Sequence, residues 1–196
     1  NNLTKKDIVK FLKMISWQFN MAVKYYKLSS ILNDIFPSIK IKYHSHHDCH
    51  AATAWFGSGL INQSIFVIDG HGETDTTTFY KSSKKGMQRI SETKWPHSMG
   101  SIYLAITRYL GYDYGDEYKV MGMSAYGEPT FYELLEESIV VSKRGEIVIK
   151  ETEYFGLKLV NSSGLERFYI KDNFAKYCCP KNQNDSFQPI HFNLAA

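Results

Sequence analysis

The residues best suited to chemistry are two histidines, His46 and His50, and the carboxylate of Asp69. Histidines four positions apart lie on one face of an α-helix, so their imidazole nitrogens can reach a single cation. Asp69 follows an apolar run at residues 64–68 and can add a carboxylate oxygen from the end of a strand. Two imidazoles and one carboxylate suit Fe(II) and also Zn(II), with coordination positions left for substrate oxygens. The spacing therefore predicts a metal site.

A simpler interpretation stays open at this point. Four histidines, at positions 44, 46, 47 and 50, crowd into seven residues, and a polar helix start needs no metal. An aspartate in a turn often hydrogen-bonds to backbone amides instead. We expect His44 and His47 to have supporting or incidental roles.

A second candidate follows the carboxylate, where Gly70 and Gly72 lie between two β-branched and aromatic segments. Exposed amides at such a turn can bind phosphate oxygens, and Glu73, Thr76 and Thr77 add polar side chains. These five residues are the predicted cofactor-binding set. An ordinary hairpin has the same glycine spacing, and no Gly-Lys-Ser/Thr follows, so the loop is not a P-loop.

The histidine-bearing helix has signals at both ends. Ser45 and Asp48 form a Ser-x-x-Asp capping box, and Gly57 and Gly59 are typical of a helix end. The partial positive charge at the helix start should favour the neutral imidazole that metals bind.

The other elements follow from hydrophobic spacing and turn residues, and together they predict a mixed α/β fold. The first two strands after the histidine helix should form a hairpin, and the next helix should pack on the sheet. The predicted elements are helices at residues 4–26, 30–36, 96–111 and 131–138, strands at 39–43, 64–68, 76–80, 87–93, 140–149 (with a turn at 143–145) and 155–160, and an ordered loop at 112–129.

Composition excludes several classes of protein. The 196 residues are 43% hydrophobic, enough for one packed domain or part of a larger one. The net charge of +3 comes from scattered basic and acidic residues, so nucleic acid is not a favoured partner. Three cysteines without framework spacing favour a reducing, cytoplasmic compartment, and no apolar run reaches the roughly 20 residues of a membrane span. The abrupt ends are typical of a fragment whose C-terminal part is missing.

Four sequence blocks follow one another over roughly residues 44–129. They are His46-His47-Asp48-Cys49-His50-Ala51-Ala52, Ile68-Asp69-Gly70-His71-Gly72-Glu73 with Thr76-Thr77, Pro96-His97-Ser98-Met99-Gly100, and Glu117-Tyr118-Lys119-Val120-Met121-Gly122-Met123-Ser124-Ala125-Tyr126-Gly127. In this order they resemble the O-carbamoyltransferase family of nodulation and antibiotic-tailoring enzymes. One departure is mild, since Met123-Ser124-Ala125 stands where the family has Leu-Ala-Pro.

The resemblance implies a two-lobed nucleotide-binding fold of the actin and Hsp70 type, with a single truncated Kae1-like domain. Residues 1–60 would be the end of the first lobe with the metal-binding helix. Residues 61–196 would start the second lobe with the phosphate-binding hairpin. The family's separate adenylate-forming domain and part of its nucleotide lobe are missing, so this chain alone is expected to be inactive.

The resemblance also implies an activity. The complete enzyme would make carbamoyl adenylate from carbamoyl phosphate and ATP, and transfer the carbamoyl group to a hydroxyl of a small molecule or sugar. His46 and His50 correspond to the family's helix ligands and Asp69 to its strand-end ligand, while a further aspartate lies downstream. The implied cofactors are Fe(II), or Zn(II), and ATP or carbamoyl adenylate. Carbamoyl phosphate, ATP and the acceptor are the partners, no membrane is expected, and a homo-oligomer is compatible with the sequence.

The catalytic residues are less determined, and the candidates are Glu73, His97, Glu117 and Lys119. His97 can instead cap its own helix, and Glu117 with Lys119 can form a solvated pair. The alternatives are tRNA threonylcarbamoyl or hydrogenase-maturation carbamoyl transfer, a non-catalytic nucleotide- or metal-binding module, and a plain metallohydrolase. The Asp-Gly-x-Gly-Glu and Glu-Tyr-Lys-Val-Met-Gly blocks favour the small-molecule carbamoyltransferase.

Overall fold

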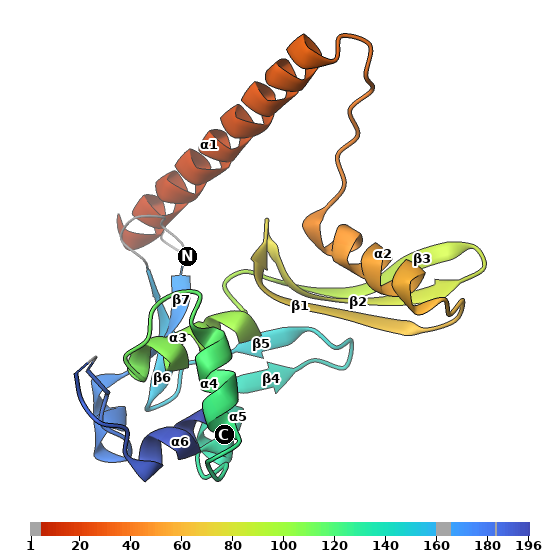
Figure 1. The fold of residues 1–196 in the computed structure, drawn as a ribbon. Helices are drawn as coiled ribbons and strands as arrows, with labels where there is room; N and C mark the ends of the chain where they lie inside the picture. Colours follow the sequence, from red (N-terminus) through yellow and green to blue (C-terminus); the bar gives the residue numbers. More distant parts are fainter. Residues whose placement is uncertain (1–4, 160–165, 183) are drawn as a thin grey trace. The chain divides into compact units, whose positions relative to one another are not determined.

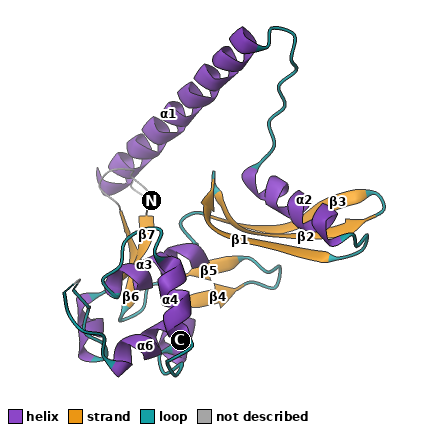
Figure 2. Ribbon diagram, viewed as in Figure 1, coloured by secondary structure: helices purple, strands orange, loops and turns teal. Residues whose placement is uncertain are grey.

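A computed structural model describes residues 5–159, 166–182 and 184–196 (Figure 1). By contacts the chain divides into two compact units, Asn1–His44 with Lys158–Arg167 and Ser45–Leu157 with Phe168–Ala196. Helices and antiparallel sheets are mixed along the chain, which confirms the α/β class (Figure 2). The lobe boundary at residues 60 and 61 stays a prediction.

The first unit contains the long helix α1, Lys5–Ile35. Its predicted start at Thr4 lies outside the described residues. The separate helix predicted at residues 30–36 is wrong, because no glycine or proline interrupts α1 before Pro37. No helix in the described ranges is both long and apolar enough to cross a bilayer.

The strand predicted at residues 39–43 is also wrong. This segment has no strand partner in the described chain. Its last residue, Tyr43, instead contacts α1, with its ring edge-on to Tyr25 at 5.8 Å and its hydroxyl hydrogen-bonded to Ser29. Side-chain contacts with the helix replace a backbone ladder here.

The second unit begins with α2, His46–Ser58, which lies along one face of a three-stranded antiparallel sheet (Figure 2). Ala51 of α2 packs there with Ile65, Val67 and Tyr80 in a small apolar core. The predicted hairpin and third strand are confirmed, although the first two strands are longer than predicted. The strands are β1 (Ser64–Gly72), β2 (Asp75–Ser83) and β3 (Gly86–Lys94), in the order β1-β2-β3.

β1 departs from regular pairing in the half that carries Asp69. Ile68 pairs with Thr77 and Gly72 pairs with Asp75, so β1 advances four residues while β2 advances two. The two extra residues form a bulge, which bends a strand and re-aims its side chains. Residues 69–71 therefore lack regular ladder partners.

A larger apolar core lies among the remaining elements of the second unit, with Phe155 and Phe174 fully buried at its centre. Helix α3 contributes Ile102 and Ile106 to this core. The elements are α3 (Met99–Tyr109), α4 (Glu117–Ser124), α5 (Tyr132–Glu136), β4 (Ile139–Val141) paired with β5 (Ile147–Ile149), β6 (Phe155–Leu159) paired with β7 (Glu166–Ile170), the 3-10 helix η1 (Asp172–Lys176) and α6 (Pro189–Ala195).

Several predicted boundaries in this unit need correction. α3 begins at Met99 and not at Pro96, because the Ser98 hydroxyl caps it by accepting a hydrogen bond from the Ser101 N–H. Helix α4 forms inside the predicted loop at 112–129, held by the buried Val120 and Met123. α5 is shorter than predicted, and the predicted end of β6 at residue 160 lies outside the described residues.

Candidate metal centre

The three predicted ligands converge where the start of α2 meets β1. His46 Nε2 lies 2.9 Å from Asp69 Oδ2 and 3.0 Å from His50 Nε2. His50 Nε2 lies 3.8 Å from the same carboxylate oxygen. All three ligand atoms lie within 4.8 Å of one another, and the side chains remain partly exposed to solvent.

This donor set fits a small divalent cation. Bonds of about 2.0–2.2 Å at angles of roughly 90–110° separate neighbouring donor atoms by about 2.8–3.6 Å. The separations of 2.9 and 3.0 Å agree with that range, and the third, 3.8 Å, needs only a small rotation of the exposed His50 ring. Two nitrogens and one carboxylate oxygen are donors that Fe(II) and Zn(II) accept.

Asp69 is held as a carboxylate. Burial opposes its ionisation, but hydrogen bonds from His46 and from the Gly70 N–H, 2.6 Å from Oδ1, outweigh that effect. The pKa of Asp69 therefore lies below its ordinary value. The ionised form is the one that binds a cation.

The cap residues of α2 are those predicted, but of the predicted capping box only the bond accepted by Ser45 forms. Ser45 is the N-cap, and its hydroxyl accepts a hydrogen bond from the Asp48 N–H at 3.2 Å. Gly59 is the C-cap with φ 69°, a left-handed conformation that glycine adopts without strain. The Asp48 carboxylate instead accepts hydrogen bonds from Tyr80 at 2.7 Å and Arg89 at 2.8 Å.

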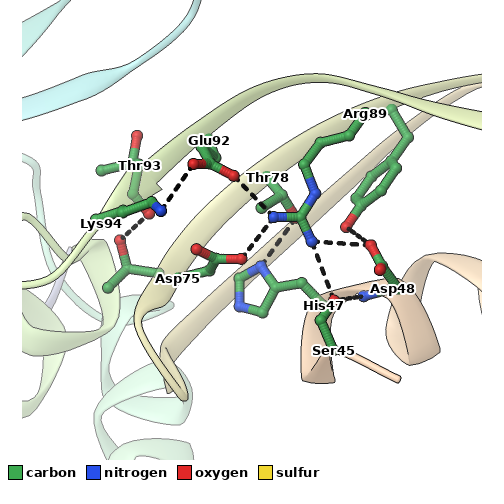
Figure 3. A network of polar contacts seen from close by, with 11 residues as sticks. Ser45, His47, Asp48, Asp75, Thr78, Arg89, Glu92, Thr93 and Lys94 are labelled. Atoms are coloured by element: carbon green, nitrogen blue, oxygen red, sulfur yellow. Dashed lines mark hydrogen bonds and ion pairs between the residues drawn. The ribbon is translucent and has the colours of Figure 1, made fainter. Parts of the chain in front are cut away.

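Arg89 of β3 ties the start of α2 to the sheet (Figure 3). Its guanidinium lies 2.8 Å from Asp48, 2.7 Å from Asp75 and 2.8 Å from Glu92. It also donates to the Ser45 hydroxyl at 3.0 Å. Sequence reasoning missed Arg89, because partners up to 44 residues away give no local signal.

The same contacts shift the pKa values of this cluster. Burial opposes ionisation of Asp48, but hydrogen bonds from Arg89 and Tyr80 outweigh it and lower the pKa. Hydrogen bonds from Lys94 and Arg89 lower the pKa of Glu92. Asp48 and Glu92 are therefore ionised at neutral pH.

His47, for which a supporting or incidental role was expected, is fully buried between α2 and the sheet. Its Nδ1 lies 2.8 Å from the Thr78 hydroxyl, and burial lowers its pKa. A Cβ at Gly72 would lie 2.4 Å from Cδ2 of His46 and 2.7 Å from Cδ2 of His47. Gly72 thus lets the end of β1 approach the two rings.

The predicted phosphate-binding residues differ in their exposure to solvent. Glu73 is exposed at the hairpin tip with φ 61°. Thr76 and Thr77 are buried, and the Thr76 hydroxyl lies 2.6 Å from the carbonyl oxygen of His97. A role of this set, with Gly70 and Gly72, in phosphate binding stays a prediction.

The other catalytic candidates lie on separate elements. His97 does not cap α3; its Nδ1 accepts a hydrogen bond from the Ile149 N–H of β5 at 3.1 Å. Lys119 of α4 pairs with Asp116 at 2.7 Å and not with Glu117. Chemical roles for these residues remain predictions.

A cleft of about 370 Å³ opens beside the metal ligands. His50 and Asp69 form its polar side, and Phe66, Val67 and Ile68 of β1 form its apolar side. The Phe66 ring stacks on Phe79 of β2 with centroids 4.7 Å apart. A substrate group could thus contact an apolar wall and the ligand set together.

Several known proteins are similar in sequence to part of this chain. The chain is 33% identical over 125 residues to nodulation protein NolNO of Sinorhizobium fredii, covering 58% of this chain and 18% of that protein. It is 36% identical over 100 residues to nodulation protein NolO of Bradyrhizobium diazoefficiens, covering 47% and 18%. An uncharacterised protein of Synechocystis is 31% identical over 131 residues, covering 64% and 21%.

The matched segments are thus only about a fifth of the length of these relatives. A family model described as the carbamoyltransferase N-terminus matches residues 6–176, which include the converging side chains and the three described sheets. With so much of the sequence matched, the chain belongs to the carbamoyltransferase N-terminal family.

Proposed function

We propose that this chain is the metal-binding part of an O-carbamoyltransferase. The whole enzyme would transfer the carbamoyl group of carbamoyl adenylate, made from carbamoyl phosphate and ATP, to a hydroxyl of a small molecule or sugar. The observation that carries the proposal is the convergence of His46, His50 and Asp69 in a chain of the carbamoyltransferase family. Similarity to two nodulation proteins favours this branch over tRNA-directed or hydrogenase-directed transfer.

The proposal includes a fold of the actin and Hsp70 type with a Kae1-like domain. A longer polypeptide would supply the adenylate-forming domain and the remaining metal ligand. The greater length of the relatives supports this part of the proposal.

The three ligands would hold Fe(II), or Zn(II) as the alternative. When bound, such an ion supplies Lewis-acid polarisation of a carbonyl or phosphoryl oxygen. His46 and His50 would each contribute a neutral imidazole nitrogen, and Asp69 would contribute one negative charge. Packing of Gly72 against the His46 ring supports a fixed orientation for that ligand.

The hairpin would bind the phosphate side of carbamoyl adenylate through the backbone at Gly70 and Gly72, with Glu73 at the tip. The Thr77 hydroxyl is buried and has no hydrogen-bond partner among the described residues, which leaves it able to donate to an oxygen. The Thr76 hydroxyl would hold the hairpin in place through the His97 carbonyl. Phe66 and Ile68 would form an apolar wall beside the reacting groups.

Metal analysis of the purified chain tests the ligand set. We expect iron or zinc in the wild type and in His44→Ala, an exposed histidine outside the cluster, and loss of the metal in His50→Ala. An unchanged metal content in His50→Ala would refute the site. The activity is tested separately with the full-length protein, carbamoyl phosphate, ATP and a panel of hydroxyl acceptors. Carbamoyl transfer would be refuted if no acceptor is carbamoylated and ATP is not turned over without an acceptor either.

A further inference from the structure

The pairing of β1 with β2 does not determine where the Asp69 side chain points. Residues 69–71 lie in the bulge between the paired residues Ile68 and Gly72. One carboxylate oxygen accepts the N–H of Gly70, so its direction depends on the peptide that joins Asp69 and Gly70. Some other element must hold that peptide.

The start of α3 makes this contact. The Ser98 hydroxyl donates to the carbonyl oxygen of Gly70 at 2.6 Å and lies 3.3 Å from that of Asp69. The Ser98 hydroxyl oxygen also accepts a hydrogen bond from the Ser101 N–H at 3.0 Å and so caps α3. Ser98 is fully buried, so water does not compete for these bonds. One hydroxyl therefore joins the first turn of α3 to the bulge.

Gly100 allows the helix to come this close. A Cβ at Gly100 would lie 2.7 Å from Gly70 Cα, 2.8 Å from Gly70 N and 3.0 Å from the carbonyl carbon of Asp69. All three are backbone atoms, so no side-chain rotation could relieve the clash. The packing requires glycine at this position.

We propose that Ser98 and Gly100 are positioning residues for the metal centre. They hold the Asp69–Gly70 peptide so that the carboxylate faces His46 and His50. Ile102 and Ile106 anchor α3 in the larger core, so that core sets the position of a metal ligand. This inference rests on the metal centre proposed above.

A pair of serine variants in the full chain tests the inference. Ser98→Gly removes the hydroxyl but keeps a residue that tolerates the N-cap position. Ser101→Ala is the control, because this buried serine of the same helix accepts the Phe168 N–H at 3.2 Å, away from the bulge. Loss of a group that orients a ligand typically weakens metal binding about 10–100-fold.

For Ser98→Gly we expect calorimetry to show a loss of Co(II) affinity of this size, and the visible spectrum of the bound Co(II) to change. Ser101→Ala should leave both unchanged. Equal losses in the two variants, or none in Ser98→Gly, would overturn the inference.

A metal-free measurement separates this inference from the proposed function. In NMR spectra of the metal-free chain, the Gly70 amide signal should shift in Ser98→Gly and not in Ser101→Ala. If the wild type binds no metal, the proposed metal centre fails, and the Gly70 signal still decides whether Ser98 holds the bulge. An unmoved signal in Ser98→Gly would overturn the inference.

Discussion

Replacing Arg89 with methionine should destabilise the protein by about 2–3 kcal/mol. Arg89 and Asp75 are largely buried, with 27% and 10% of their side chains exposed, and lie 2.7 Å apart. Removing one partner of a buried ion pair costs about 3–5 kcal/mol, and the partial exposure of Arg89 reduces this to about 2–3 kcal/mol. Asp48 and Glu92, 46% and 37% exposed, add little.

Urea unfolding followed by circular dichroism measures this loss as a difference in the free energy of unfolding. Arg108→Met is the matched control, because Arg108 is an exposed arginine near the end of α3. Its change should stay within about 0.5 kcal/mol. A loss in Arg89→Met no larger than in the control would refute the argument, since the three carboxylates would then need no arginine.

The destabilisation should also depend on pH. The pKa values of Asp48 and Glu92 lie below their ordinary values of 3.8 and 4.5 in the folded chain. A lowered pKa gives stability that is present above the unfolded-state value and is lost as pH falls through the folded-state value. Because Asp48 and Glu92 add little to the loss, the difference between wild type and Arg89→Met should be constant near neutral pH and decrease only slightly below about pH 4. A difference that grows in acid would contradict this assignment.

Two further predictions follow from burial. Gly72→Ala should cost about 1–3 kcal/mol and weaken metal binding, because its Cβ would meet the His46 ring at 2.4 Å. The control Gly57→Ala, with open space around it in α2, should stabilise the chain by about 0.5–1 kcal/mol. Equal urea midpoints for the two variants would contradict the contact between Gly72 and His46. Burial raises the pKa of Cys178 to about 11, so at pH 8 a thiol reagent should label the two exposed cysteines quickly and Cys178 only on unfolding. Three equally fast thiols would disprove that burial.

Local signals in the sequence were sufficient for much of the second unit. The capping serine and closing glycine placed α2, and alternating residues placed the hairpin, because caps and strand patterns act over a few residues. Helical spacing brought His46 and His50 together in the prediction, and the strand end supplied Asp69. The prediction was wrong at residues 30–36, where no glycine or proline breaks α1. It was also wrong at residues 39–43, where side-chain contacts with α1 replace a strand partner.

The sequence by itself determined which side chains could bind a metal and which elements carry them. Only the tertiary structure decided what holds them there: the Arg89 contacts with three carboxylates, the burial of His47, and the approach of Ser98 and Gly100 to the bulge. Two of the ligands follow a spacing of four residues, and the third, predicted at a strand end, lies in a bulge within β1. The Arg89–Ser45 and Ser98–Gly70 contacts join residues 44 and 28 positions apart, and such pairs leave no periodic mark in the chain because packing alone brings them into contact.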